Sequence, residues 1–163
     1  MAHLDPDRAY IAALWEQPTL VIALFGIQLL TEEGAKLWES SGIGAEIDPS
    51  LDAAPGLLFN RSMTTGEGPV LMQYWRSYED LDRYARAMPH GRWWKWLFDH
   101  AGSGVGFYHE IYEVKTAEAV YEPGTGPAGP ARFSTPISVA RGEGRSRERQ
   151  RRFRDAAAAA EGT

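Results

Sequence analysis

The chain of 163 residues contains no cysteine and only four histidines. Without cysteine there is no disulfide framework, no thiolate metal ligand and no cysteine nucleophile, and the chain suits a reducing cytoplasm. The longest apolar run, from Thr19 to Leu30, is too short to cross a bilayer and follows a charged, proline-marked segment. We therefore expect a soluble cytoplasmic protein with no membrane partner.

Several motifs of enzymes and metalloproteins are also missing. His3, His90, His100 and His109 lie apart in the sequence, so no metal site built from several histidines is expected. The glycines of GSGVGF, residues 102–107, have the wrong order and context for a dinucleotide-binding loop, and HEIYE, residues 109–113, completes no zinc-protease motif. The chain has neither a phosphate-binding loop nor a nucleophile elbow.

Charge is unevenly distributed along the chain. The net charge is −5, which divides into −8 over residues 1–140 and +3 over residues 141–163. An acidic body argues against binding of nucleic acid by the folded domain. The basic tail is able to touch RNA or acidic partners, but such charge runs are usually solvated and poorly ordered.

The length and an apolar content of 44% indicate one domain with a substantial core. Hydrophobic periodicity, caps and breakers predict a helix over Ala2–Glu16 and a second helix that opens at Thr31 and dissolves at Ser41–Gly44. A further helical turn is predicted over Asp48–Asp52. A helix after Ser77 is interrupted by Pro89 and resumes at His90. Four strands are predicted over Leu20–Leu30, Pro55–Met63, Pro69–Arg76 and Val105–Lys115.

This order, β-α-β-β-α-β, predicts an α+β ferredoxin-like plait with an extra N-terminal helix and a C-terminal extension. Apolar residues occupy consecutive strand positions, so the sheet face opposite the helices also needs a cover, and a second copy provides one in a homodimeric α+β barrel. We predict a single dimeric domain over residues 1–140, with a core at 19–115 and a wrapping loop at 116–140 that ends in an edge strand near Ile137–Val139. Residues 141–163 are predicted to be a frayed or disordered tail.

The first candidate site lies at the end of the third predicted strand and in the helix after Pro89. Strand alternation places Tyr74 and Arg76 on one face and Trp75 on the other. If Trp75 faces the helices, it meets His90 and Trp94, which form a pocket with aromatic walls and one imidazole. An aromatic core in which His90 merely bonds a carbonyl is the alternative.

The second candidate is VGFYHEIYEV, residues 105–114. Alternation puts His109 and Glu110 on opposite faces, so the two neighbours cannot form a simple acid–base dyad. Arg76 is a candidate ion-pair partner for Glu110, in either a structural or a functional role.

These segments carry a resemblance. YWRSYEDLDRYAR, the following histidine and Trp-rich helix, VGFYHEIYEV and AVYE together resemble a fumagillin-pathway monooxygenase-like family of the dimeric α+β-barrel clan, over Val21 to Tyr121. The resemblance implies the plait and the dimer. It favours functional roles for Trp75, Arg76, His90, Trp94, His109 and Glu110. We predict a catalytic set of His90, His109, Arg76 and Glu110, and a substrate-binding set of Tyr74, Trp75, Trp94 and Tyr112.

Three functions are therefore compared. The first is a tailoring monooxygenase of secondary metabolism that needs no bound cofactor or metal and acts on a small hydrophobic phenol, polyketide or terpenoid, with His90 or His109 as general base and Arg76 stabilising an oxyanion. The second is a haem b enzyme of the clan, an aldoxime dehydratase-like lyase or a haem-processing enzyme, with His90 or His109 as axial ligand. The third is a non-catalytic dimeric binding module.

Overall fold

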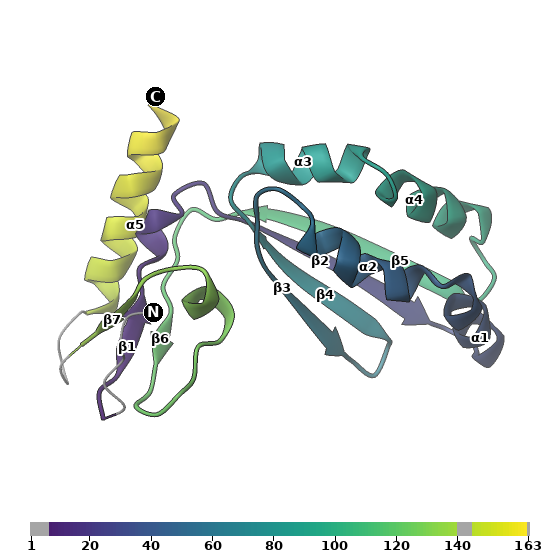
Figure 1. Ribbon diagram of the computed structural model, residues 1–163, viewed down its shortest axis with the longest axis horizontal. Helices are drawn as coiled ribbons and strands as arrows, with labels where there is room; N and C mark the ends of the chain where they lie inside the picture. The colour runs from purple at the N-terminus through teal and green to yellow at the C-terminus, as the bar shows by residue number, and fades with distance from the viewer. Residues whose placement is uncertain (1–6, 140–144, 163) are drawn as a thin grey trace. The chain divides into compact units, whose positions relative to one another are not determined.

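One of the two inner strands of the larger sheet is β2 (Val21–Leu29), which lies within the predicted Leu20–Leu30 segment. The computed structural model describes residues 7–139 and 145–162 (Figure 1). In it, β2 joins β3 (Leu57–Thr64), β4 (Pro69–Trp75) and β5 (Val105–Glu113) in the order β3-β4-β2-β5. Both β2 and β3 run antiparallel to β4, and Val21 lies opposite Trp75.

The helices lie over one face of this sheet (Figure 1). They are α1 (Glu32–Ser41), α2 (Ile43–Asp52), α3 (Tyr78–Arg86) and α4 (His90–Asp99). Thr31 and Ser77 cap α1 and α3, since their hydroxyl oxygens accept from the backbone N–H groups of Gly34 and Asp80 at 3.0 and 3.3 Å. The predicted break at Pro89 separates α3 from α4. The α+β ferredoxin-like plait is thus confirmed.

The segment after α1 differs from the prediction of a dissolving helix and one further turn. α2 is a full helix, joined to α1 at Gly42, whose backbone has a positive φ of 71°. Its buried residues Ile43, Ile47 and Leu51 recur at intervals of four and enter the main core with Trp75, which is completely buried. Burial of this apolar stripe explains why a helix forms where glycine, serine and proline weaken local propensity.

The predicted N-terminal helix over Ala2–Glu16 is wrong for residues 7–16, the part of it that the structure describes. The chain forms β1 (Tyr10–Ala12) and a short 3-10 helix, η1 (Leu14–Glu16). β1 is the middle strand between β6 (Val120–Tyr121) and β7 (Pro136–Ser138). All five residues from Tyr10 to Leu14 are buried, because both strand edges are paired, whereas an amphipathic helix would bury one stripe.

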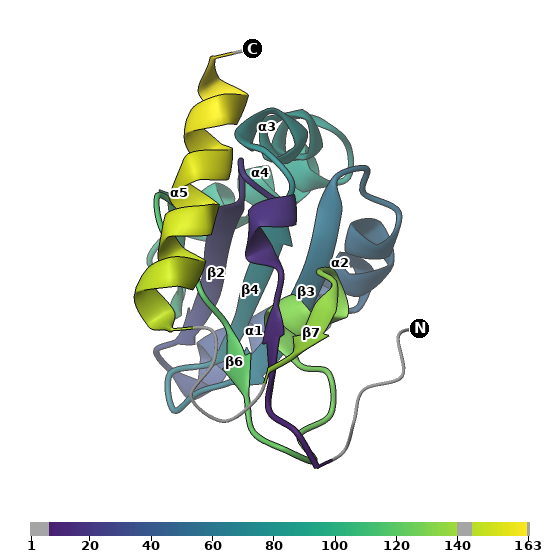
Figure 2. The same ribbon diagram turned by 90° about the vertical axis from the view of Figure 1, so that its left-hand side faces the viewer.

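The extension after β5 is ordered through much of its length. Residues 116–139 contain β6, a 3-10 helix, η2 (Gly129–Arg132), and the predicted edge strand as β7 (Figure 2). Tyr121 stacks on Tyr10 with ring centroids 4.6 Å apart, and its hydroxyl donates to the carbonyl of Ala128 at 2.6 Å. These contacts hold the proline-rich segment in place.

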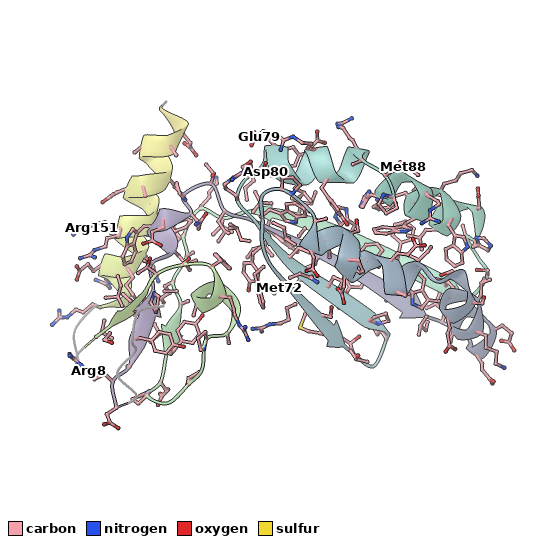
Figure 3. All side chains as sticks on the ribbon, viewed as in Figure 1. Arg8, Met72, Glu79, Asp80, Met88 and Arg151 are labelled. Atoms are coloured by element: carbon pink, nitrogen blue, oxygen red, sulfur yellow. The ribbon has the colours of Figure 1, made fainter. Side chains whose placement is uncertain are left out.

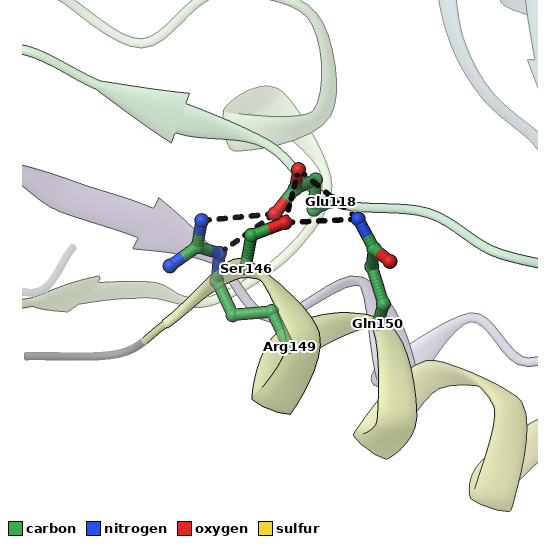
Figure 4. A network of polar contacts seen from close by, with 4 residues as sticks. All are labelled: Glu118, Ser146, Arg149 and Gln150. Carbon is green, nitrogen blue, oxygen red and sulfur yellow. Dashed lines mark hydrogen bonds and ion pairs between the residues drawn. The ribbon is translucent and has the colours of Figure 1, made fainter.

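The tail prediction is wrong over residues 146–161, which form the helix α5 (Ser146–Glu161). Phe153 is completely buried, and the Arg152 guanidinium lies over the Trp15 ring, 5.2 Å from its centroid. Glu118 accepts hydrogen bonds from the Ser146 hydroxyl at 2.8 Å and from Arg149 at 2.9 Å (Figure 4). A basic, polar helix is thus anchored by one aromatic side chain and one carboxylate.

Contacts group the chain into two compact units, one of residues 21–112 and one of residues 1–20 with 113–163. The predicted wrapping loop therefore belongs with the terminal segments, while the plait forms a unit of its own. Within the described residues, no helix has the length and apolarity to traverse a bilayer. No group of three or more His, Asp or Glu side chains in residues 7–139 and 145–162 is arranged to hold a metal.

Candidate functional site

A small cavity lies between the helix-facing side of the sheet and the helices α2, α3 and α4. Its volume is about 30 Å³, which suffices for one or two water molecules. We call it the aromatic cavity; its walls come from the plait unit and are Phe25, Ile47, Leu71, Gln73, Leu81, Tyr84, His90, Trp93, Trp94, Leu97 and His109. Two histidines and one glutamine are the polar side chains of this otherwise apolar and aromatic wall.

His109 reaches the cavity from β5. Its ring centroid lies 6.4 Å from that of Phe25 and 5.7 Å from that of Trp94, so it faces the helices. In the part of the chain that the structure describes, neither of its ring nitrogens has a hydrogen-bond partner. Burial lowers the pKa of His109 below its ordinary value of 6.5. At neutral pH the ring is uncharged and keeps a lone pair that can accept a proton.

His90 is held by two hydrogen bonds. It begins α4, and its Nδ1 lies 2.8 Å from the carbonyl oxygen of Ala85. Because a carbonyl only accepts, Nδ1 carries the proton, and Nε2 accepts from the indole N–H of Trp94 at 3.1 Å. Burial lowers the pKa of His90, an effect that its bond to Ala85 opposes and its neighbour His109 reinforces. Its lone pair is therefore already engaged.

The two predicted tryptophans have different positions. Trp94 lines the cavity and makes an edge contact with Phe107 of β5 at a centroid distance of 5.0 Å. Trp75 does face the helices, but it lies behind the cavity wall, where its ring contacts Tyr84 at 5.2 Å. Trp94 is placed to touch a ligand, whereas Trp75 supports residues that do.

Three of the predicted site residues point to the other face of the sheet. A Cβ on Gly26 would meet the Tyr108 ring at 2.2 Å, so Tyr108 covers the face of β2 opposite that of Phe25. Glu110 and Tyr112 share this orientation by alternation, and the Tyr112 hydroxyl donates to Glu110 at 2.7 Å. Tyr74 lies on this face too, against Phe59 at a centroid distance of 6.1 Å.

Arg76 is engaged at the start of α3. Its guanidinium pairs with Asp80 at 2.8 Å, and Arg83 pairs with the same carboxylate at 2.7 Å. Asp80 is buried, which by itself would raise its pKa, but the hydrogen bonds from Arg83 and Arg76 outweigh burial and lower it. Arg76 thus pairs with Asp80, whereas we had predicted a pair with Glu110. The catalytic and binding sets predicted from the sequence are split between two faces.

An open groove of about 700 Å³ runs beside the cavity, between α2 and the helices α3 and α4. Tyr84 lines both the groove and the aromatic cavity, and its hydroxyl lies 3.2 Å from that of Ser50 on α2. Met88, in the link between α3 and α4, borders the groove and is exposed (Figure 3). This groove was not predicted, because the segment that forms α2 was expected to be only a turn.

Comparison with known proteins now adds to this geometry. The profile of the family described as monooxygenase af470-like matches residues 44–126, a range that holds both histidines of the cavity. The chain belongs to the monooxygenase af470-like family. Membership confirms the monooxygenase-like resemblance seen in the sequence, while the fumagillin-pathway affiliation stays a prediction. A comparison with curated proteins gave no match.

Solved structures similar to this member of the monooxygenase af470-like family include two aldoxime dehydratase structures. One has 21% identity and a TM-score of 0.61, and covers 96% of this chain and 46% of that chain. The second, aldoxime dehydratase OxdRE with butyraldoxime, has 16% identity and a TM-score of 0.63, and covers 95% and 45%. The chain thus spans less than half the length of either enzyme. SnoaB of Streptomyces nogalater, a cofactor-independent oxygenase, has 10% identity and a TM-score of 0.47, over 61% of this chain and 96% of that chain. At such identities the likeness concerns the fold.

Proposed function

We propose that this protein is a tailoring oxygenase that needs no bound cofactor and oxidises a hydrophobic phenolic, polyketide or terpenoid substrate in the aromatic cavity. The observation that carries the proposal is His109, an uncharged imidazole with an unengaged lone pair in an apolar wall. Family membership supports an oxygenase, and the scarcity of charged side chains around the cavity suits a hydrophobic substrate.

The reaction that suits this site begins with proton removal. His109 takes a proton from a CH₂ group that an adjacent carbonyl or phenol makes acidic, and the carbanion passes electrons to dioxygen as a C–O bond forms. The imidazolium returns the proton to the peroxide. Loss of the second C–H proton then accompanies cleavage of the O–O bond, which leaves a C=O group on the substrate and releases water. The carbon is oxidised by four electrons and dioxygen is reduced by four.

Substrate reaches His109 only if the cavity opens. A volume of about 30 Å³ admits water but no ring of a phenol or polyketide. Tyr84 separates the cavity from the larger groove. On the α2 side it is held by a hydrogen bond between its hydroxyl and that of Ser50 and by packing against α2. We assign Tyr84 as the side chain that moves when substrate enters from the groove.

Dioxygen uptake by chelator-treated protein, with a panel of phenolic and terpenoid ketones, tests the proposal. Replacing His109 with Asn should reduce uptake by 10²-fold or more, the usual contribution of a general base. The matched variant His90→Asn should keep most of the uptake while lowering stability. An inert chelator-treated protein, or equal loss in both variants, would contradict the assignment of His109. Retention of tight substrate binding without turnover would favour the binding-module alternative.

A haem enzyme is the alternative function, favoured by the fold match to aldoxime dehydratase along 95% of the chain. Of the two histidines, His109 would hold the haem, because its nitrogens have no hydrogen-bond partner among the described residues, whereas His90 would have to give up the Trp94 hydrogen bond. A bound haem would supply redox or Lewis-acid chemistry. A Soret band on haem addition that disappears in His109→Ala and persists in His90→Ala would select this alternative over the first.

The predicted homodimer remains part of the proposal. Near the end of β5, on the sheet face opposite the helices, the large side chain of Tyr112 is 51% exposed. A second copy of the chain is the cover we propose. Sedimentation equilibrium should give a mass twice that of the 18.1 kDa chain, and Tyr112→Lys should shift it toward the monomer.

A further inference from the structure

Gln73 contributes a carboxamide to the wall of the aromatic cavity. It lies on β4 opposite Ala23 of β2, and alternation directs it toward the helices, as it does Trp75. Its residue is 8% exposed, so more than nine-tenths of it is buried. A buried carboxamide needs hydrogen-bond partners for an acceptor and two donors, and an unpaired one is costly.

One neighbour fixes which way the carboxamide points. The indole N–H of Trp75 lies 3.0 Å from Oε1 of Gln73. An indole nitrogen can only donate, so the atom it meets must be the carboxamide oxygen, and the orientation of the group follows from chemistry. Trp75 is completely buried and in contact with Tyr84, which keeps the donor in place. The amide nitrogen of Gln73 must therefore point elsewhere.

The amide nitrogen has two N–H groups and no acceptor within the described residues. Among these residues, only Asn60 and Ser134 have a side-chain polar atom that lacks a partner and is also completely buried. The amide nitrogen of Gln73, which lacks a partner, is therefore not completely buried. This nitrogen is thus open to the aromatic cavity that Gln73 lines together with His109. The cavity consequently contains the N–H groups of a neutral carboxamide and, on His109, an imidazole that can act as a base.

We propose that Gln73 is a substrate-binding residue that donates a hydrogen bond to a ketone or phenol oxygen of the substrate. This inference rests on the proposed function and narrows its substrate class to neutral aromatic ketones and phenols whose oxygen activates an adjacent CH₂ group. When His109 removes the proton, negative charge moves onto that oxygen, and the hydrogen bond from Gln73 strengthens. Gln73 takes the oxyanion-stabilising role that we predicted for Arg76. Arg76 does not line the cavity.

Because the Gln73 carboxamide carries no charge, it should also determine which substrates the cavity accepts. A carboxamide in an apolar wall stabilises a carbonyl oxygen, but it cannot offset the desolvation of a fully ionised carboxylate. In the described residues that line the cavity there is no Lys or Arg to do so. The site should therefore prefer a ketone over the corresponding carboxylic acid.

Binding of α-tetralone and tetralin tests the inference without turnover, because the two compounds differ only in the carbonyl oxygen. Quenching of tryptophan fluorescence should show that the wild-type protein binds α-tetralone about tenfold more tightly, the worth of one hydrogen bond. Gln73→Met should abolish the preference and leave tetralin binding within about twofold. Gln28→Met, at a glutamine of β2 that bonds Glu67 and does not line the cavity, is the matched control and should retain the preference. Trp75→Phe removes the group that orients the carboxamide and should weaken the preference.

A second measurement does not depend on a variant that folds. In ¹⁵N-labelled wild-type protein, the side-chain amide signal of Gln73 should shift on addition of α-tetralone and stay in place with tetralin. Equal binding of both compounds, or a preference that survives in Gln73→Met, overturns the role of Gln73. Failure of both to bind overturns the cavity as a ligand site as well. A Gln73-dependent preference without dioxygen uptake would leave the inference standing and refute the oxygenase.

Discussion

The indole N–H of Trp94 donates to Nε2 of His90 across one turn of α4, at 3.1 Å. Since Nδ1 of the same ring bonds to the carbonyl of Ala85 in α3, His90 connects the two helices on either side of Pro89. The imidazole that begins the aromatic helix is thus a structural connector, and His109, which faces it across the cavity, keeps its lone pair.

Removal of the Trp94 indole should therefore cost more than the loss of ring area. We expect Trp94→Phe to lower the free energy of unfolding by about 1–3 kcal/mol, because Nε2 of the half-buried His90 loses its donor. Trp96→Phe on the same helix is the control, since Trp96 stacks on His100 and has no indole hydrogen bond among the described residues. Equal losses in urea unfolding would show that the hydrogen bond contributes nothing.

The pH dependence of the proposed reaction follows from His109. Burial places its pKa below 6.5, and the neutral form is the active base. The value of kcat/KM should rise with pH through a pKa lower than 6.5 and be level at neutral pH. An inflection of kcat/KM above pH 6.5 would assign the base to another group. So would a pH profile that stays the same when His109→Asn, measured through its residual activity, replaces the wild-type protein.

Stability should respond to acid in the same pH range. The pKa values of His90 and His109 are both lower in the folded chain than in the unfolded chain, where they are near 6.5. The unfolded state therefore binds more protons as the pH falls below 6.5, and the free energy of unfolding declines. Above that pH the contribution is complete and constant. Urea titrations at several pH values should show this decline, and it should become shallower in His90→Asn.

Gly56 should tolerate no side chain. Its φ is +87°, and a Cβ there would meet the buried carboxyl of Asp80 at 2.3 Å, where that group binds Arg76 and Arg83. Gly42 has a similar φ of +71° but open space around it. Gly42→Ala should cost about 1–2 kcal/mol from backbone strain alone, and Gly56→Ala distinctly more. Equal shifts of the unfolding midpoint in the two variants would mean that Asp80 moves away from the added Cβ with no loss of stability.

The anchoring of α5 depends on Phe153. Its completely buried ring predicts that Phe153→Ala lowers stability by about 3–5 kcal/mol and exposes the helix to protease. Phe153→Leu should lose less, because it keeps apolar volume. Limited proteolysis, with cleavage sites read by mass spectrometry, distinguishes release of α5 from global unfolding. A protease-resistant Phe153→Ala protein would assign the anchoring to the Glu118 contacts instead.

The plait was predictable because its signals are local. The run Leu20–Leu30, the cap at Ser77 and the break at Pro89 each act within a few residues. β1 was not, because its partners lie more than a hundred residues later, with Tyr10 opposite Tyr121. Local propensity contains no information about such a partner.

The site was predictable only in part, for a similar reason. Alternation correctly separated His109 from Glu110, but it could not say which face the helices cover. Only the folded chain shows that the rings of Phe25 and Trp94 contact His109. It also shows that the indole N–H of Trp75 orients the Gln73 carboxamide. Gln73 differs from its strand neighbours by being polar, and that was the signal that could have identified it.

Tyr84 also suggests how the protein could be re-engineered. One aromatic ring sets the boundary between the small cavity and the groove, and it is distinct from both His109 and Gln73. Libraries that vary this single position should therefore change the size of the molecules accepted while leaving the reactive groups untouched. The range of accepted substrates and the reaction itself could then be altered independently.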